Sequence, residues 1–266
     1  MTGGGSGIGR VLVHHFSSLS SDFLSGSGVE CRYKVLTCGR RLSALEDTMN
    51  QAPCPERVTI VRADIAKAED RQQVVDALPT NAHVCLLVQN AAVGDPSTDL
   101  ASVDIGHLEY AFKVNVSGPL ALVQLLLPFL KPKCEAATAT AVRSRILHLG
   151  TSVAHRPQKG TLTYGVTKMA FHRLYQQLNA EGDVVCGSFS PGLVDTEGVR
   201  DHVHKARNCN LPHVEYFDRA LGSRNESWVT EPDQLVTFVM ELLSMDEALF
   251  ESKEWRFSEW RANQGV

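Results

Sequence analysis

The stretch Thr2-Gly3-Gly4-Gly5-Ser6-Gly7-Ile8-Gly9 (TGGGSGIG) decides the fold class of this chain. It fits the pattern T-G-x-x-x-G-x-G, and an apolar helical pattern follows over residues 8–19. Glycines at this spacing let the backbone turn tightly and approach a pyrophosphate, while the next helix offers free N–H groups and a positive dipole end. Flexible tails contain similar strings, but the helix favours a dinucleotide-binding turn. Its expected contacts are Gly3, Ser6, Gly7, Ile8 and Gly9.

Beyond this turn, short apolar runs alternate with longer helical patterns. Strands are predicted at residues 33–38, 57–62, 83–88, 144–149 and 184–189. These runs are apolar on both faces, as expected for parallel strands covered by helices on each side. Helices are predicted at residues 8–19, 42–51, 68–77, 106–130, 163–180 and 233–245. This alternation predicts an α/β fold, a Rossmann-like doubly wound parallel sheet in a single domain over residues 1–266.

The composition of the 266 residues is that of an ordinary globular domain, with 43% hydrophobic and 21% charged residues. No apolar run approaches the roughly 20 residues that span a bilayer, because the longest run, residues 120–130, contains Gln124 and Pro128. We therefore expect no membrane partner. The net charge of −4 argues against a nucleic-acid partner. The 7 cysteines form no C-x-x-C pair and no cluster of metal ligands, so a cytoplasmic protein without a metal site is expected.

The residues at the end of the strand predicted at 33–38 indicate the type of cofactor. The chain reads Thr37-Cys38-Gly39-Arg40-Arg41, with no acidic residue to bind the ribose 2′-hydroxyl of NAD. Arg40 and Arg41 instead suit a 2′-phosphate through charge-assisted hydrogen bonds. NADP(H) is the expected cofactor, and the alternative is a solvated arginine pair at the start of a helix.

Two further strand ends carry candidate cofactor contacts. Asp64-Ile65 follows the strand at 57–62 and would place a carboxylate near the adenine amine. Asn90-Ala91-Ala92 follows the strand at 83–88 and would lie under the adenosine ribose. Each has a structural alternative, as a helix cap or a turn of small residues.

The candidate catalytic residues lie in the second half of the chain. Tyr164 and Lys168 are four residues apart and share one helix face. A nearby ammonium favours the phenolate form and makes the phenol a better acid–base near neutral pH. Ser152 follows a predicted strand and would hydrogen-bond a substrate carbonyl, while Asn115 would hold a water that relays protons towards Lys168. Each feature also has a common structural alternative: the Tyr164–Lys168 spacing as an exposed helix pair, Ser152 as a strand-end cap, and Asn115 as a buried amide. The order and spacing of the set after the glycine turn is what makes it specific.

Together with Pro191-Gly192, these motifs resemble the short-chain dehydrogenase/reductase family over nearly the whole chain. The resemblance implies hydride transfer between NADP(H) and a small carbonyl or alcohol. It implies that Tyr164 is the acid–base, that Ser152 orients the carbonyl, that Lys168 binds the nicotinamide ribose and that Asn115 completes the relay. It places Pro191, Gly192, Val194 and Thr196 along the nicotinamide, and it implies a homodimer or homotetramer.

A narrower similarity is to the sepiapterin reductase branch. It rests on Arg156–Gly160 before the tyrosine and on Ser190–Thr196 after the last predicted strand. That branch holds its pterin with an acidic residue near the C-terminus, where this chain has Arg256 flanked by Glu254 and Glu259. A sepiapterin-like compound or a diketone is the expected substrate. Residues 198–228 form the variable substrate loop, whose His202, His204 and His213 are interpreted as surface residues.

The family also places a central strand before the glycine turn, where this sequence has only Met1. We therefore expect that the natural start lies upstream or that the chain is a truncated product, with two inner strand edges left unpaired. The leading hypothesis is an NADPH-dependent carbonyl reductase. The alternatives are a non-catalytic NADP(H)-binding sensor on the same fold and an inactive fragment.

Overall fold

The computed structural model describes residues 1–19, 33–94, 99–130, 143–222 and 229–265. Most of the two expected loop insertions, residues 17–30 and 131–143, lies outside the described residues, as do residues 223–228 of the substrate loop.

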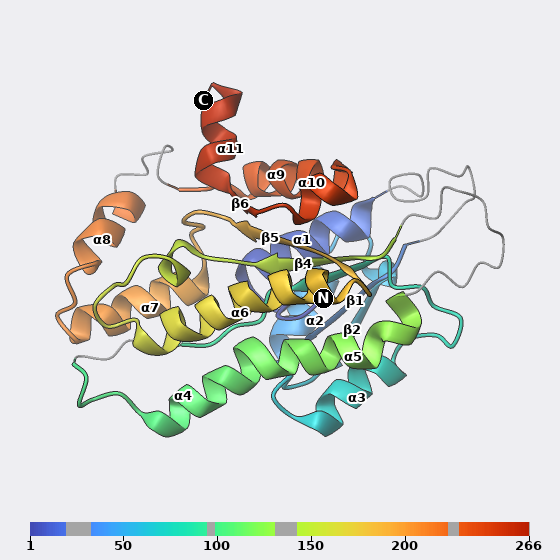
Figure 1. Cartoon of the computed structure of the whole chain (residues 1–266), viewed down its shortest axis with the longest axis horizontal. Helices are drawn as coiled ribbons and strands as arrows, with labels where there is room; N and C mark the ends of the chain where they lie inside the picture. The colour runs from blue at the N-terminus through green and yellow to red at the C-terminus, as the bar shows by residue number, and fades with distance from the viewer. Residues whose placement is uncertain (20–32, 95–98, 131–142, 223–228, 266) are drawn as a thin grey trace.

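Parallel strands form the centre of the molecule (Figure 1). Their bounds confirm the predicted strands and add a short one near the C-terminus: β1 (Val35–Gly39), β2 (Val58–Arg62), β3 (Leu86–Gln89), β4 (Arg145–Leu149), β5 (Val185–Ser190) and β6 (Glu254–Arg256). β1 pairs with β2, and β3, β4, β5 and β6 pair in that order. Every residue of β5 is buried, as expected for an inner strand of a sheet with both faces covered.

Met1 and Thr2 connect these two groups of strands. Thr2 forms isolated parallel bridges with Cys38 of β1 and with Gln89 of β3. Its N–H donates to the Val88 carbonyl at 3.0 Å, and the Cys38 N–H donates to the Met1 carbonyl at 3.1 Å. The inner edges of β1 and β3 are therefore paired at their carboxyl ends, next to the glycine turn. The expectation of an upstream start stays a prediction.

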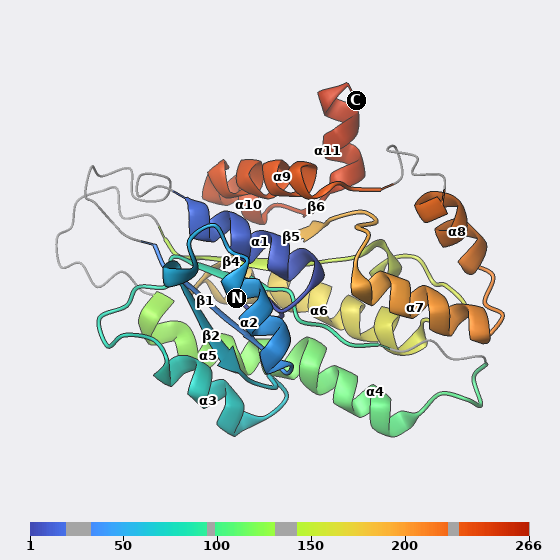
Figure 2. The ribbon, with the colours of Figure 1, turned by 180° about the vertical axis from the view of Figure 1, so that it is seen from behind.

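Two layers of helices cover the sheet, one on each face (Figures 1 and 2). The first layer contains α1 (Gly7–Ser18), α2 (Leu42–Asn50), α9 (Pro232–Ser244) and α10 (Glu247–Glu251). The second contains α3 (Ala68–Asp76), α4 (Ile105–Phe112), α5 (Gly118–Leu130) and α6 (Leu162–Glu181). Beyond the carboxyl ends of the strands lie α7 (Glu197–Asn208) and α8 (Val214–Gly222), and α11 (Phe257–Gln264) follows β6. The fold is thus the predicted Rossmann-like α/β domain.

Each helical layer has its own apolar core. The core against α9 is built around Leu12, Leu235 and Phe238, with Phe189 and Phe250 fully buried beside them. The core on the opposite face contains side chains from α3, α5 and the sheet: Val74, Val75, Leu122, Leu126 and Ile146. This double burial explains why the strands read as largely apolar runs and not as alternating ones.

The helix predicted over residues 106–130 is continuous from Ile105 to Leu130, but Lys113–Ser117 forms a π-helical turn between α4 and α5. The length and apolar composition of Ile105–Leu130 are sufficient for a membrane span. The sequence did not predict this, because polar residues interrupt its apolar run. Several of its side chains pack in the core, and Asn115 makes buried hydrogen bonds to the rest of the fold. These contacts are those of a core helix.

His148 of β4 is fully buried between the sheet and α6. Its ring stacks on Phe171 at 4.1 Å between centroids, with Tyr175 edge-on at 6.1 Å. Burial lowers the pKa of His148 to about 3, and the positive charge of Lys168 acts in the same direction. Between about pH 3 and about pH 6.5, His148 is protonated in the unfolded chain but stays neutral in the folded protein.

The His148→Leu variant is expected to remove this source of acid sensitivity. The pKa of His148 is lower in the folded protein than in the unfolded chain. Its contribution to the free energy of unfolding is therefore fully present above about pH 6.5 and declines as the pH falls, by at most about 1.4 kcal/mol per pH unit. Urea denaturation at pH 7 and pH 5 measures the effect: the wild type should lose about 2 kcal/mol more than the variant over this interval. An equal loss in both proteins would refute a buried neutral imidazole.

Candidate active site

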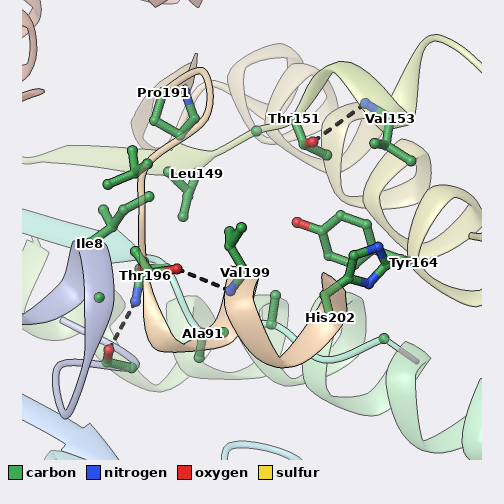
Figure 3. Close-up of a pocket in the computed structure, with 18 of the residues that line it drawn as sticks. Ile8, Ala91, Leu149, Thr151, Val153, Tyr164, Pro191, Thr196, Val199 and His202 are labelled. Atoms are coloured by element: carbon green, nitrogen blue, oxygen red, sulfur yellow. Dashed lines mark hydrogen bonds between the residues drawn. The ribbon is translucent and has the colours of Figure 1, made fainter. Parts of the chain in front are cut away.

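A cavity of about 1470 Å³ lies at the carboxyl ends of the strands, between the glycine turn, α6 and the α7–α8 pair. Figure 3 shows its centre, with the phenol of Tyr164 pointing into the space bounded by Leu149, Val199 and Ile8. Most of the predicted site residues line it: Gly3, Ser6, Gly7, Ile8, Arg40, Arg41, Asp64, Ile65, Asn90, Ala91, Ala92, Ser152, Tyr164, Pro191, Gly192, Val194 and Thr196. The buried residues Gly9, Asn115 and Lys168 are not among those lining residues. The cavity therefore brings the predicted cofactor and catalytic regions together.

The glycine turn has the geometry of an anion cradle. Gly3 and Gly7 adopt φ values of +72° and +53°, which favour glycine. A Cβ on Gly9 would lie 2.1 Å from the Gly3 carbonyl oxygen, so a larger residue would displace the turn. The side chain of Ser6 makes no capping hydrogen bond at the start of α1, and the first turn of α1 contains no acid. The N-terminus of α1 is thus suited to a pyrophosphate.

Thr2 and Asn90 hold this turn in place. The Thr2 hydroxyl accepts hydrogen bonds from the N–H groups of Asn90 and Ala91, both at 3.1 Å. The Asn90 side chain donates to the carbonyls of Thr2 and Gly3 at 3.1 and 3.0 Å. Asn90 therefore fixes the glycine turn to the end of β3, a role in addition to its predicted place below the adenosine ribose.

Arg40 and Arg41 follow β1 at one side of the cavity. Arg40 donates to the Tyr110 hydroxyl at 3.1 Å, and that hydroxyl donates to Asp64 at 2.9 Å. Arg41 forms two hydrogen bonds of 3.1 Å with Glu197 at the start of α7. These bonds are the main cause of a raised pKa for Arg41 and a lowered pKa for Glu197. Both guanidinium groups are exposed and positioned to receive an anionic group.

The hydroxyl beside Tyr164 is that of Thr151 and not that of Ser152. Burial raises the pKa of Tyr164 to about 12, and a hydrogen bond with the Thr151 side chain opposes this rise. Thr151 caps the short 3-10 helix Ser152–Ala154 by accepting from the Val153 N–H at 3.4 Å. That turn directs Thr151 towards the phenol and leaves Ser152 exposed at the cavity wall. The structure therefore places the Thr151 hydroxyl beside the phenol, and the predicted role of Ser152 in orienting the substrate carbonyl stays a prediction.

Lys168 is 3% exposed and lies behind the cavity wall, one helical turn after Tyr164. Its ammonium donates to the Leu149 carbonyl and lies 4.6 Å from the centroid of the Phe171 ring. Burial lowers the pKa of Lys168 to about 8, and the negative charge of Glu254 opposes this shift. Near neutral pH Lys168 is therefore a cation held at the end of β4.

Asn115 lies in the π-helical turn and joins three segments. Its side-chain oxygen accepts from the Val93 N–H at 2.8 Å, and its side-chain nitrogen donates to the Val93 carbonyl at 2.7 Å and to Thr167 at 2.8 Å. Both donor hydrogens are thereby used within the protein. The side chain holds the chain after β3 against α6, so the structure supports a positioning contact, and its part in a proton relay stays a prediction.

The segment after β5 forms the opposite wall of the cavity. Gly192 adopts a φ of +75°, and Thr230 donates to the Pro191 carbonyl at 2.7 Å. Thr196 caps α7 through a hydrogen bond from Val199 and packs against Gly7, where a Cβ would lie 3.0 Å from the Thr196 side chain. This segment therefore runs along the glycine turn, and its predicted contact with the nicotinamide stays a prediction.

His202 and His213 are half-buried residues of the cavity wall, which corrects their interpretation as surface residues. They lie on α7 and in the turn before α8, their rings stack at 5.2 Å, and their Nε2 atoms are 3.1 Å apart. His204 is exposed, as predicted. The two helices replace the loop expected here, because Val203, Ala206, Leu211 and Val214 form a small apolar core between them.

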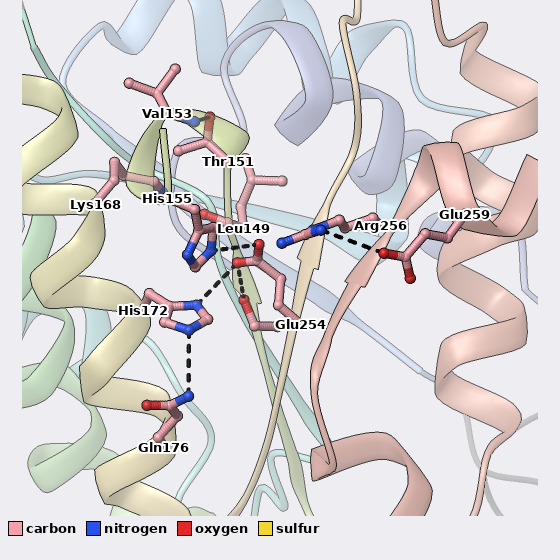
Figure 4. A network of polar contacts seen from close by, with 11 residues as sticks. Leu149, Thr151, Val153, His155, Lys168, His172, Gln176, Glu254, Arg256 and Glu259 are labelled. Carbon is pink, nitrogen blue, oxygen red and sulfur yellow. Dashed lines mark hydrogen bonds and ion pairs between the residues drawn. The ribbon is translucent and has the colours of Figure 1, made fainter. Parts of the chain in front are cut away.

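Sequence reasoning missed a cluster of His155, His172 and Glu254 (Figure 4). His155 and His172 each contact one carboxylate oxygen of Glu254, at 3.1 and 3.2 Å. Burial acts to raise the pKa of Glu254, but the hydrogen bonds and charges of the two histidines outweigh it and leave the pKa lowered. His155 lies in the turn after β4, His172 on α6 and Glu254 on β6, so no local sequence motif predicts the cluster.

Comparisons with known proteins agree with this architecture. Residues 1–207 match the family model described as short chain dehydrogenase. An uncharacterized oxidoreductase of Staphylococcus epidermidis is 25% identical over 199 residues, which cover 74% of this chain and 77% of that protein. The benzil reductase of Bacillus subtilis, described as (S)-benzoin forming, is 21% identical over 228 residues, covering 82% and 89% of the two chains.

The same fold occurs in a solved structure, the RhlG/NADP active-site complex of Pseudomonas aeruginosa. The TM-score is 0.71 at 20% identity, and the match covers 96% of this chain and 92% of that one. Because the matching family model spans most of the chain and includes the glycine turn, Tyr164 and Lys168, the protein belongs to the short-chain dehydrogenase/reductase family of oxidoreductases.

Proposed function

We propose that the protein is an NADPH-dependent carbonyl reductase, which in the reverse direction oxidises the corresponding alcohol. The observation that carries this proposal is the placement of the Tyr164 phenol in the same cavity as the glycine turn and the arginine pair. A protein that only senses a dinucleotide has no need of an acid–base group facing that cavity. The preserved geometry of Tyr164, Thr151 and Lys168 therefore favours catalysis.

The preference for NADPH rests on charge. Arg40 and Arg41 follow β1, and among the described residues the carboxylates next to them are engaged: Asp64 accepts from Tyr110, the partner of Arg40, and Glu197 pairs with Arg41. A 2′-phosphate arriving here meets two guanidinium groups and competes with Glu197 for Arg41. The phosphate carries more charge than the carboxylate, so this exchange favours the phosphorylated cofactor.

The cofactor in this cleft supplies the hydride, and the chain supplies the proton and the orientation. Tyr164 is protonated near neutral pH because its pKa is raised, so it is ready to donate a proton to the carbonyl oxygen as that oxygen becomes negative. The Thr151 hydroxyl orients the same oxygen. Lys168, held on the Leu149 carbonyl, stabilises the phenolate that remains after proton transfer.

We further propose a compact apolar or aromatic ketone, such as a diketone or a sepiapterin-like compound, as substrate. The apolar lining of the cavity includes Leu149, Val153, Val199 and Phe217, and its polar lining includes His155 and His202. Arg256 and Glu259 lie at its rim, 3.5 Å apart. The benzil reductase of Bacillus subtilis acts, by its name, on an aromatic diketone, which is consistent with this lining.

A panel of sepiapterin, benzil, aliphatic diketones and simple aldehydes, assayed with NADPH and with NADH, tests the proposal. We expect NADPH oxidation with at least one aromatic or pterin ketone and slower turnover with NADH. Tight NADPH binding without turnover on any of these carbonyls would instead support the non-catalytic sensor.

Thr151 and Ser152 give a sharper test of the site. The Thr151→Val variant is expected to lower kcat by about 100-fold, because it removes one hydrogen-bond donor to the developing oxyanion. Thr151→Ser retains the hydroxyl and should keep most of the activity. Ser152→Ala is the matched control and should change kcat little, and a larger loss in that control would restore Ser152 as the orienting residue.

We also propose that the enzyme is cytoplasmic and assembles as a homodimer or homotetramer through α5 and α6. The exposed side chains of Val166 and Met169 on α6 support such an interface. Light scattering of the purified protein measures the assembly, and a monomer at micromolar concentration would contradict it.

A further inference from the structure

His155, His172 and Glu254 form a compact set of possible metal ligands beside the active site. One imidazole nitrogen from each histidine and one carboxylate oxygen of Glu254 lie within 4.8 Å of one another. Figure 4 shows the two rings and the carboxylate turned towards a common point, from α6, from the turn after β4 and from β6. The cluster is therefore built by the tertiary fold from three separate segments.

The chemistry of these donors points to one class of ion. Two imidazoles and one carboxylate are the donor set that zinc and related first-row divalent ions prefer in proteins. Ligand atoms about 2.0–2.2 Å from a tetrahedral ion are about 3.4 Å from one another. The distances of 3.1 and 3.2 Å between the histidine nitrogens and Glu254 are close to that value, so an ion replaces the shared protons with only small movements of the side chains.

The surroundings hold these ligands in place and leave one approach open. The side chain of Glu254 is 4% exposed, whereas those of His172 and His155 are 14% and 25% exposed. Ser188 donates to Glu254 at 3.3 Å, and the Gln176 amide lies 3.4 Å from the second ring nitrogen of His172. Such contacts behind the ligands orient metal sites. His155 lines the cavity, which provides a path for the ion and an open position for water.

Cationic side chains lie on the elements that carry His172 and Glu254. The charge of Lys168 on α6 interacts with that of Glu254, but its ammonium donates to the Leu149 carbonyl. Arg256 on β6 pairs with Glu259, at 3.5 Å. Because neither cation forms an ion pair with Glu254 among the described contacts, its carboxylate is bonded to His155, His172 and Ser188 and remains the anionic ligand of the cluster.

We propose that His155, His172 and Glu254 bind a divalent ion of the zinc class at the wall of the active-site cavity. The ion takes one nitrogen from each histidine and the Glu254 carboxylate, with the remaining position facing the cavity. This site does not depend on the proposed reductase activity, because its ligands are separate from Thr151, Tyr164 and Lys168. The bound ion would add a positive charge at the cavity wall, and none of the sequence motifs predicts this charge.

Metal titration of the purified full chain tests the proposal. After treatment with EDTA and dialysis, the protein is titrated with Zn²⁺ against a chromophoric chelator and, separately, with Co²⁺. We expect one equivalent to bind and the Co²⁺ complex to show the intense visible bands of a four-coordinate site. Glu254→Gln and His172→Ala should each weaken binding by at least about 100-fold.

The matched controls are His204→Ala, an exposed histidine of α7, and Glu259→Gln, an exposed carboxylate beside the cavity. Both should leave the affinity unchanged. Binding that is equal in all variants, or no binding by the wild type, would reduce the cluster to a hydrogen-bonded triad and overturn the proposal.

A second test uses the wild type alone, so that it remains valid even if the variants fail to fold. Diethyl pyrocarbonate modifies accessible histidines, and mass spectrometry maps the modified positions. Zn²⁺ should protect His155 and His172 but leave His204 reactive. Unchanged modification of His155 and His172 in the presence of Zn²⁺ would contradict the site even if the ion binds elsewhere.

Discussion

The Tyr164→Phe variant is expected to lose about 1000-fold in kcat and to bind NADPH as tightly as the wild type. The change removes a single oxygen, the one that points into the cavity (Figure 3), and keeps the ring that fills its place. General acid catalysis contributes about 100-fold to 10,000-fold, and Tyr164 is a phenol of this cavity that is hydrogen-bonded to Thr151. Steady-state rates on the best ketone, together with NADPH fluorescence titration, measure the two quantities separately.

Tyr175→Phe provides the matched control. Tyr175 lies on the same helix, α6, but is 2% exposed and packs in the core beside His148 and His172. Its hydroxyl is remote from the cavity lining, so the control should retain activity with at most a small loss of stability. If Tyr164→Phe keeps its turnover, Tyr164 is not the proton donor and the proposed mechanism fails.

The double variant Arg40→Ala, Arg41→Ala is expected to abolish the preference for NADPH over NADH. A hydrogen bond to a charged group contributes about 1.5–3 kcal/mol, so the loss of both guanidinium groups should raise the Kd for NADPH by at least about 100-fold. The Kd for NADH should hardly change, because the remaining adenosine contacts come from the glycine turn and the ends of β2 and β3. Titration with both cofactors at fixed ionic strength measures the ratio.

Arg62→Ala is the control for this pair. Arg62 ends the neighbouring strand β2, is exposed and does not line the cavity. The control has the same change in net charge per site and should leave both affinities unchanged. An NADPH affinity that falls equally in Arg62→Ala would mean that the general field of the protein, and not a specific phosphate site, sets the preference.

Much of the fold was predictable from the sequence because its signals are local. The strands at 35–39, 58–62 and 145–149 are largely apolar runs, as expected for parallel strands covered by helices on both faces. The glycine turn was predictable because a backbone that approaches a phosphate closely excludes side chains, as the 2.1 Å contact at Gly9 demonstrates. The placement of Tyr164 and Lys168 on one face of α6 follows from helical spacing alone.

The sequence by itself therefore determined the Rossmann-like architecture, the family and the phenol–ammonium pair. Only the tertiary structure decided which hydroxyl meets Tyr164, because one turn of 3-10 helix directs Thr151 inward and leaves the adjacent Ser152 outside. It alone placed His202 and His213 in the cavity wall. It alone assembled His155, His172 and Glu254, since contacts between residues so far apart in the chain are determined by how the layers pack and not by any local pattern.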